Sequence, residues 1–489
     1  MAIRHPLPYA YAKAQHVLLE DNGQQRTLWA APGLSLAVLS ELQRVHAPQR
    51  LESIPASELA QRLQAAYAGG EDSAALVIGE VESAVDLSRL MQDLPAVEDL
   101  LETADDAPII RMLNALLTQA ARDGASDIHI EPYERHSSVR FRVDGTLREV
   151  VQPNRALHAA LISRLKIMAD LDISEKRLPQ DGRISLRLGT RAIDVRVSTL
   201  PSAHGERAVL RLLDKSENKI SLEAVGMQGE TLRRFEGLIS QPHGIILVTG
   251  PTGSGKTTTL YAGLGRLDAT RNNIMTVEDP VEYDIPGISQ TQVNAKIDMT
   301  FARALRSILR QDPDVVMIGE IRDLETAQIA VQSSLTGHLV MATLHTNSAA
   351  STITRMLDMG VESFLLSSTL IGILAQRLIR LLCPKCKTEN LTLSQALREE
   401  YTIPDGTKIY RAAGCDYCSG TGYKGRTGIH ELLMVDDEVQ RLIHTNASET
   451  AIELYATEKC HMRTLRMDGL RWVIEGKTSI EEIIAITKE

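Results

Sequence analysis

Four short segments in the second half of the chain are apolar at consecutive rather than alternate positions. They are GIILVTG (244–250), NIMTVED (273–279), DVVMIGE (314–320) and HLVMATLH (338–345). Helix-compatible segments separate them. Apolar runs of this kind are typical of parallel strands covered by helices on both faces. The pattern therefore predicts an α/β domain built on a parallel sheet.

The preceding segment has a different pattern. IIRMLNALLTQAARDGA (109–125) is strongly amphipathic at helical spacing and closes on Gly124. Short alternating strands follow, and Asp144-Gly145 between VRFRV and TLREV is a strong signal for a two-residue hairpin. RISLRL and RAIDVRVS repeat that form around Gly189-Thr190. We expect an α+β domain here.

The first 68 residues mix short apolar segments with a helical stretch, LSLAVLSELQRV (34–45), and carry no catalytic signature. Residues 69–107 hold eleven acidic residues against one basic residue, Arg89. Repulsion between like charges and low packing potential favour a flexible connector there. The first 68 residues are therefore expected to form a detachable module.

Composition places the chain among ordinary globular proteins of several domains. It has 489 residues, which is too long for one core, with 43% hydrophobic and 24% charged residues. The net charge of -10 and the 3% of aromatic residues argue against nucleic-acid binding, which favours basic surfaces and stacking platforms. No apolar stretch approaches a membrane span and no secretory signal begins the chain, so we expect a cytoplasmic protein.

The segment at 250–257, GPTGSGKT, matches the phosphate-loop pattern. Its glycines let consecutive backbone N–H groups wrap a phosphate, Lys256 reaches the β and γ phosphates, and the Thr257 hydroxyl binds Mg²⁺. The segment follows an apolar strand and opens a plausible helix, as the pattern requires. The predicted nucleotide-binding positions are Gly250, Pro251, Thr252, Gly253, Ser254, Gly255, Lys256, Thr257 and Thr258.

Acidic residues end two of the predicted strands, Glu320 after one and Glu278, Asp279 and Glu282 after another. Parallel strands place such residues at the same carboxyl edge of the sheet, where ligands of α/β folds bind. One of these carboxylates should orient and deprotonate the attacking water. Two histidines that flank the strand LVMATL could sense the γ phosphate, although a lone histidine is usually a core residue; they are His338 and His345.

Phosphoryl transfer also needs positive charge beside the γ phosphate. Arginines are plentiful both in the helical segment FARALRSILRQ (301–311) and on strands of the preceding domain. From the residues alone, each is read as a surface arginine or an ion-pair partner.

Two cysteine pairs, Cys383-Pro-Lys-Cys386 and Cys415-Asp-Tyr-Cys418, are separated by 28 residues. Four thiolates in two such knuckles form a closed tetrahedral Zn²⁺ site, which is structural because it has no open position. A redox CxxC is the alternative, and the matched pairs argue against it.

Several of these segments together resemble the secretion-superfamily ATPases: GPTGSGKTTTLYA, TVEDPVEY, ILRQDPDVVMIGEIRDLETA, LTGHLVMATLHTNSA and LCPKC…GCDYCSGTGYKGRTGIHELL. The chain is most similar there to the type II secretion assembly ATPase, the E subunit of the general secretory pathway. The resemblance covers residues 98–489. LPYAYAKAQHVLLED (7–21) adds a weaker match to the start of that subunit.

The resemblance implies roles for particular residues. Glu320 matches the Walker B acid, and Glu282 matches the favoured catalytic base of the Asp box, with Glu278 as its competitor. His338 and His345 match the His box, and the cysteine tetrad matches a zinc module. Arginines matching positions implicated in nucleotide or interface contacts are Arg196, Arg211, Arg306, Arg310 and Arg322.

The resemblance also implies an architecture, a RecA-like P-loop core preceded by an α+β domain, with ATP between the two in a hexameric ring. The expected parts are an N-terminal membrane-partner docking module (1–68), an acidic linker (69–107), a PAS-like α+β domain (108–220), a RecA-like ATPase domain (221–380), a tetracysteine zinc module (381–430) and a C-terminal helical region (431–489).

By resemblance, the chain is a cytoplasmic homohexamer that hydrolyses ATP with Mg²⁺ to power pseudopilus assembly and protein export. Its N-terminal module would dock on the cytoplasmic domain of the bitopic inner-membrane L subunit, and a polytopic inner-membrane platform protein would be a further partner. Three alternatives stay open: a type IV pilus extension ATPase, a nucleic-acid translocase with the same core, and a scaffold that binds ATP without hydrolysing it.

Overall fold

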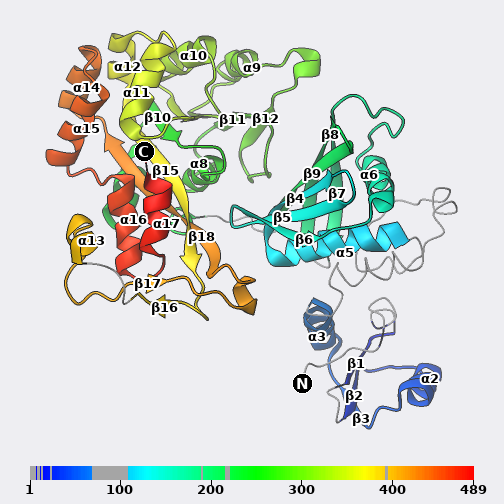
Figure 1. Cartoon of the computed structure of the whole chain (residues 1–489). Coiled ribbons are helices and arrows are strands. Elements are labelled where there is room, and N and C mark those ends of the chain that lie inside the picture. Colours follow the sequence, from blue (N-terminus) through cyan, green and yellow to red (C-terminus); the bar gives the residue numbers. More distant parts are fainter. Residues whose placement is uncertain are drawn as a thin grey trace. The chain divides into compact units, whose positions relative to one another are not determined.

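The computed structural model describes residues 15–21, 25–68, 108–188, 191–214, 221–390 and 395–488, together with Leu7 and Ala12. The chain forms two compact units, residues 1–216 and 217–489 (Figure 1). The predicted acidic linker at 69–107 lies outside the described residues. Among the residues that are described, no helix is both long enough and apolar enough to cross a bilayer.

The N-terminal module is a three-stranded sheet with two helices. Strand β2 (Arg26–Ala30) lies in the middle, antiparallel to β1 (Val17–Asp21) and parallel to β3 (Arg50–Ser53). Helices α2 (Leu36–His46) and α3 (Ala56–Ala68) follow β2 and β3. Leucines from strands and helices share one core, and they include Leu18, Leu28, Leu42 and Leu59.

The second part of this unit is an antiparallel sheet of six strands, in the order β6-β5-β4-β9-β8-β7, with two helices. The apolar stripe of α5 (Pro108–Asp123) is buried, so the predicted amphipathic helix is confirmed. The remaining elements are β4 (Ala125–Pro132), β5 (Ser137–Val143), β6 (Thr146–Val151), α6 (Arg155–Met168), β7 (Gln180–Leu188), β8 (Arg191–Ser202) and β9 (Gly205–Asp214).

The predicted hairpin turn at Asp144-Gly145 is confirmed. Val143 pairs with Thr146 across it, and both turn residues have positive φ, 49° and 83°. A two-residue loop with positive φ at both positions matches the twist of the flanking strands, and Asp-Gly tolerates that conformation best. The second predicted hairpin also forms, since Leu188 pairs with Arg191, but its two turn residues are not described.

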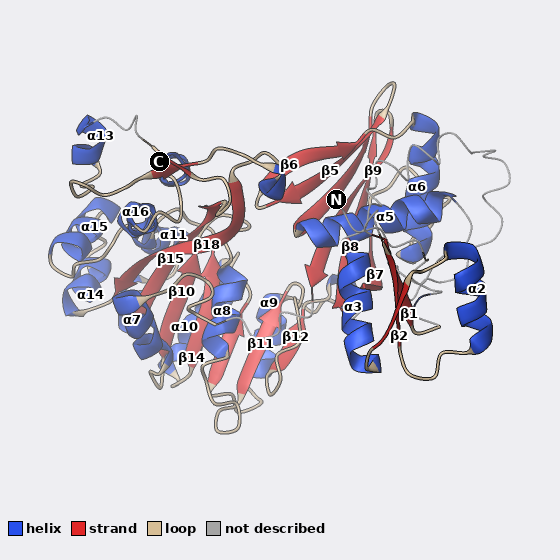
Figure 2. Cartoon of the chain, turned by 90° about the horizontal axis from the view of Figure 1, so that it is seen from below, coloured by secondary structure: helices blue, strands red, loops and turns tan. Residues whose placement is uncertain are grey.

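The second unit is built on a sheet of seven strands in the order β12-β11-β13-β14-β10-β15-β18 (Figure 2). All neighbours are parallel except β15 and β18. The strands are β10 (Gly244–Thr249), β11 (Ile274–Glu278), β12 (Ser289–Gln292), β13 (Val315–Ile318), β14 (Leu339–Leu344), β15 (Leu370–Leu382) and β18 (Tyr423–Met434).

Strand β10 shows why the predicted strands are apolar on both faces. Ile245 and Leu247 enter one core, which includes residues of α9 (Phe301–Ile308), α10 (Leu324–Leu335) and α11 (Ala349–Asp358). Ile246 and Val248 enter the other, which includes residues of α7 (Gly229–Ile239) and α8 (Lys256–Leu264). The predicted α/β class with a helix-covered parallel sheet is therefore confirmed.

The sheet extends further along the sequence than the apolar runs indicated. Strands β15 and β18 pair over most of their length, and they enclose a small cysteine-bearing region. The elements of that region are β16 (Thr388–Glu389), α13 (Gln395–Glu400) and β17 (Tyr410–Arg411). The other helices of this unit are α12 (Ser363–Thr369), α14 (Asp437–His444), α15 (Glu449–Glu458), α16 (Leu465–Ile474) and α17 (Ile480–Thr487).

Candidate functional site

The predicted phosphate loop joins the end of β10 to the start of α8, which begins at Lys256 with Gly255 as its N-cap. Gly253 and Gly255 have φ of 79° and 85°, which favours glycine. A Cβ on Gly250 would lie 2.4 Å from the backbone oxygen of Gln376, so glycine is needed there because β15 packs closely. A loop of this shape directs backbone N–H groups and a helix N-terminus toward an anion.

Lys256 is buried in this loop, with 8% of its surface exposed. Its Nζ donates to the carbonyl oxygens of Gly250 at 2.8 Å and Pro251 at 3.1 Å. Burial lowers the pKa of Lys256 to about 8, against the opposing effect of the Glu320 carboxylate. The ammonium group is therefore incompletely neutralised, and a bound anion would stabilise its charged form.

Glu320, which follows the end of β13, is brought to this lysine together with His345. The two nitrogens of the His345 ring lie 3.5 Å from Lys256 Nζ and 3.3 Å from a Glu320 carboxylate oxygen. The other Glu320 oxygen pairs with Arg322, and this ion pair raises the pKa of that guanidinium. Four of the predicted site residues thus form one connected cluster at the carboxyl edge of the sheet.

Glu278, at the end of β11, is buried in hydrogen bonds. One carboxylate oxygen accepts from Thr276 at 2.6 Å and from Gln290 Nε2 at 3.1 Å, and the other accepts from the Tyr261 hydroxyl. Burial, and then the hydrogen bond to Glu278, raises the Tyr261 pKa. Glu278 therefore joins α8 to β11 and β12, a role that packing alone explains.

Glu282 lies four residues further along the same segment and is partly exposed. Its backbone N–H donates to the Tyr261 hydroxyl at 3.3 Å. Because Tyr261 stands on α8, the helix that begins with the phosphate loop, this bond connects the backbone of Glu282 to the loop through one helix. The choice between the two glutamates as general base stays a prediction.

The two predicted histidines lie at opposite ends of β14. His345 follows the strand, beside the phosphate loop, whereas His338 precedes it, level with Gly244 at the start of β10. The Nδ1 atom of His338 lies 2.8 Å from the carbonyl oxygen of Ser333. A six-residue strand separates its ends by about 17–20 Å. The structure therefore brings His345, but not His338, to the phosphate loop.

The remaining predicted arginines are not brought to Lys256 within the second unit. Arg306 on α9 pairs with Glu325, and Arg310 donates to the Arg306 carbonyl oxygen at 2.8 Å. Arg196 and Arg211 are cross-strand neighbours on β8 and β9 of the first unit, where Arg211 binds Asp127 at 3.0 Å. Their predicted contacts with nucleotide or with other subunits stay predictions.

The four predicted metal ligands, Cys383, Cys386, Cys415 and Cys418, converge, with all sulfur atoms within 4.8 Å of one another. Three of the sulfur pairs are separated by 3.8 to 3.9 Å. Zinc with sulfurs at about 2.3 Å in a tetrahedron requires roughly 3.8 Å between them, whereas a disulfide requires about 2.05 Å. The cysteines therefore fit a structural zinc ion, and they are free thiols in the structure.

Three polar residues around this site were missed by sequence reasoning. Tyr261 and Gln290 hold Glu278, and Gln376 of β15 contacts the phosphate loop. Tyr261 and Gln376 stand among apolar neighbours, and Gln290 lies on a short edge strand. The only signal available was a polar group in an otherwise apolar strand or helix face, which marks a buried hydrogen bond and does not identify its partner.

Comparisons with known proteins agree with this site. A family model described as Type II/IV secretion system protein matches residues 102–485, and a model of the N-terminal domain of GSPII protein E matches residues 6–67. Type II secretion system protein HxcR of Pseudomonas aeruginosa is 60% identical over 483 residues, covering 99% of both chains. Type II secretion system ATPase E of Vibrio cholerae is 54% identical over 494 residues, covering 99% of this chain and 97% of the relative.

Solved structures give the same fold. The pilus retraction motor PilT with bound ADP is 25% identical, with a TM-score of 0.51 over 76% of this chain and 96% of that one. The Legionella pneumophila ATPase DotB, at 18% identity, matches in fold with a TM-score of 0.58 over 81% of this chain and 97% of that one. Since the phosphate loop and its acids occur in a chain that these models and relatives match almost end to end, the protein belongs to the type II/IV secretion system family, among the type II secretion system E proteins.

Proposed function

We propose that this protein hydrolyses ATP to ADP and phosphate, and that the energy drives pseudopilus assembly and protein export by a type II secretion system. The observation that carries the proposal is the cluster of Lys256, Glu320 and His345 at the phosphate loop, in a chain with relatives named as type II secretion ATPases. The match of residues 6–67 to the N-terminal domain of GSPII protein E favours secretion over pilus extension.

In this mechanism the loop at 250–257 and Lys256 bind the β and γ phosphates, and Thr257 and Glu320 would hold Mg²⁺. Bound Mg²⁺ neutralises charge on the phosphates. Glu282 accepts a proton from the attacking water, and His345 lies where it reports the state of the γ phosphate to Glu320. Arginines from a neighbouring subunit of a homohexamer, among them Arg196 and Arg211, supply the further positive charge.

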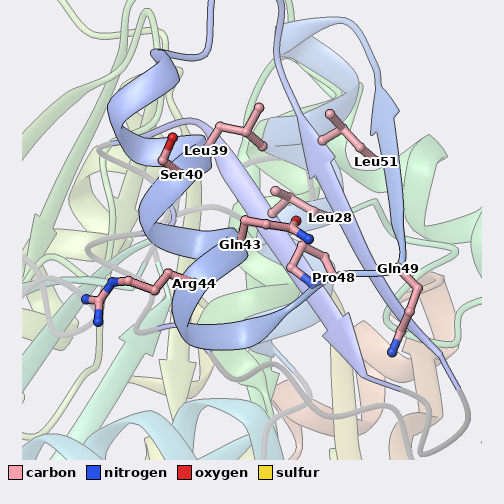
Figure 3. A pocket seen from close by; sticks show the side chains of 8 residues that line it. All are labelled: Leu28, Leu39, Ser40, Gln43, Arg44, Pro48, Gln49 and Leu51. Atoms are coloured by element: carbon pink, nitrogen blue, oxygen red, sulfur yellow. The ribbon is translucent and has the colours of Figure 1, made fainter.

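The N-terminal module is proposed to dock on the cytoplasmic domain of a bitopic inner-membrane protein, which attaches the ATPase peripherally. A pocket of about 640 Å³ lies between α2 and strands β2 and β3 (Figure 3). Leu39, Leu28 and Leu51 line it, and Leu51 is 54% exposed. An exposed leucine at an edge strand is the kind of apolar contact that such a partner would cover.

The proposal is tested by phosphate release from the full chain with Mg²⁺ and ATP, with and without the cytoplasmic domain of the membrane partner. We expect release that the partner increases, and that Lys256→Ala abolishes, because the buried ammonium is the cation placed at the loop. Release no greater than in Lys256→Ala, with the partner present, would show a scaffold. Binding to a pilus platform and not to the secretion partner would favour the pilus alternative.

A pH dependence follows from the buried lysine. Burial lowers the pKa of Lys256 to about 8 in the free protein, and a bound phosphate anion raises it. Below pH 8 the lysine is charged in both states, so ATP affinity should not change with its titration. Above pH 8 binding must take up a proton, so the affinity should fall up to about tenfold per pH unit.

Calorimetry of the binding of a non-hydrolysable ATP analogue at pH 8.5, in two buffers of different ionisation enthalpy, measures this proton uptake. At pH 7 the same experiment should show none from this lysine. Equal affinity at pH 7 and pH 9, with no uptake at either, would contradict the prediction.

A further inference from the structure

Gln376 lies in the middle of β15 and is fully buried. Its neighbours along the strand, Leu374, Ala375 and Leu378, are the apolar residues expected in such a position. A buried amide lowers stability unless its donors and acceptors are bonded. Its presence here therefore indicates specific partners rather than a packing requirement.

Those partners flank Lys256. The side-chain Nε2 of Gln376 donates to the carbonyl oxygen of Ser254 at 2.8 Å, and its Oε1 accepts from the Thr259 hydroxyl at 2.6 Å. The residue also limits the size of both loop glycines. A Cβ on Gly250 would lie 2.4 Å from its backbone oxygen, and a Cβ on Gly255 would lie 2.9 Å from its Nε2.

The bond to Ser254 has a directional consequence. In a planar trans peptide the carbonyl and the following N–H point to opposite sides. Holding the Ser254 carbonyl toward Gln376 therefore turns the N–H of Gly255 away from Gln376. Gly255 is the N-cap of α8, next to Lys256, so this N–H belongs to the set that a phosphate loop presents to an anion.

We propose that Gln376 is a positioning residue, whose side-chain amide holds the phosphate loop in its anion-binding shape before nucleotide arrives. The inference rests on the proposed binding of ATP at this loop. It deepens that function by assigning part of the nucleotide affinity to a residue on β15, 122 positions beyond Ser254 in the sequence.

The test compares Gln376→Met, which keeps the length of the side chain but removes both hydrogen bonds, with Thr259→Val, which removes only the bond to Oε1. We expect Gln376→Met to raise the KM for ATP and the Kd for ADP about tenfold, which corresponds to one lost hydrogen bond to the loop. The kcat should change less. Thr259→Val leaves the Ser254 bond intact, so its KM should stay within about threefold of the parent.

A second variant separates positioning from stability. In Gln376→Glu a protonated carboxyl can donate to Ser254, whereas a carboxylate repels that carbonyl, and burial raises the pKa of a buried carboxyl toward neutrality. Its KM should therefore approach the parent value near pH 6 and rise steeply by pH 8, with the unfolding temperature of every variant recorded beside it.

Unchanged KM and Kd in Gln376→Met would overturn the inference, as would a Gln376→Glu KM that follows the parent's pH profile. If Gln376→Met does not fold, the pH profile of Gln376→Glu decides alone. Failure of the proposed function would look different, because the unaltered chain would then release no phosphate.

Discussion

Replacing Glu282 by glutamine is expected to lower the kcat for ATP hydrolysis by about 10²–10⁴-fold, the usual contribution of a general base. ATP binding should change little, because the loop and Lys256 are untouched. The physical reason is that Glu282 is partly exposed, with its backbone connected to α8 through the Tyr261 hydroxyl. Single-turnover phosphate release and the Kd of a non-hydrolysable ATP analogue measure the two quantities.

Glu278→Gln is the matched control, because it removes the same charge four residues earlier. Glu278 accepts hydrogen bonds from Thr276, Tyr261 and Gln290, so the substitution disturbs a buried network. We expect a loss of about 1–3 kcal/mol in the free energy of unfolding and a smaller loss of kcat. If Glu278→Gln folds normally and loses turnover while Glu282→Gln retains it, the assignment of the base is reversed.

Replacing Cys383 by serine is expected to release the zinc ion and to destabilise the second unit by several kcal/mol. Structural zinc sites bind with apparent free energies of about 10–16 kcal/mol, and part of that energy stabilises the fold. Cys383 directly follows β15, and β18 begins five residues after Cys418. The metal would therefore tie together the two ends of the antiparallel pair that closes the large sheet.

Metal content and thermal unfolding of the full chain measure this effect, and a chelator should reproduce it in the unaltered protein. Cys460→Ser is the control, because Cys460 lies outside the cluster and its thiol donates to Asp436 at 3.3 Å. That variant should keep its zinc. Less than about half an equivalent of zinc in the native protein would contradict the prediction.

Local sequence was enough to predict the parts of the site that are contiguous. The phosphate loop needs glycines, a lysine and a threonine at fixed spacing between a strand and a helix, and its eight residues are consecutive. The cysteine pairs are likewise short knuckles, and the structure brings their sulfurs together. The Asp144-Gly145 hairpin and helix α5 also follow from turn chemistry and from apolar periodicity within one segment.

What the sequence by itself determined, therefore, is the class of fold, the family and the identity of the phosphate loop and the metal ligands, because each depends on neighbours along the chain. The tertiary structure decided which distant residues meet. Only strand order and direction separate His345 from His338, place Glu278 in a buried network, and bring Gln376 against the loop. Those contacts join segments up to 122 residues apart, and a side chain shows nothing in the sequence of the partner that folding supplies.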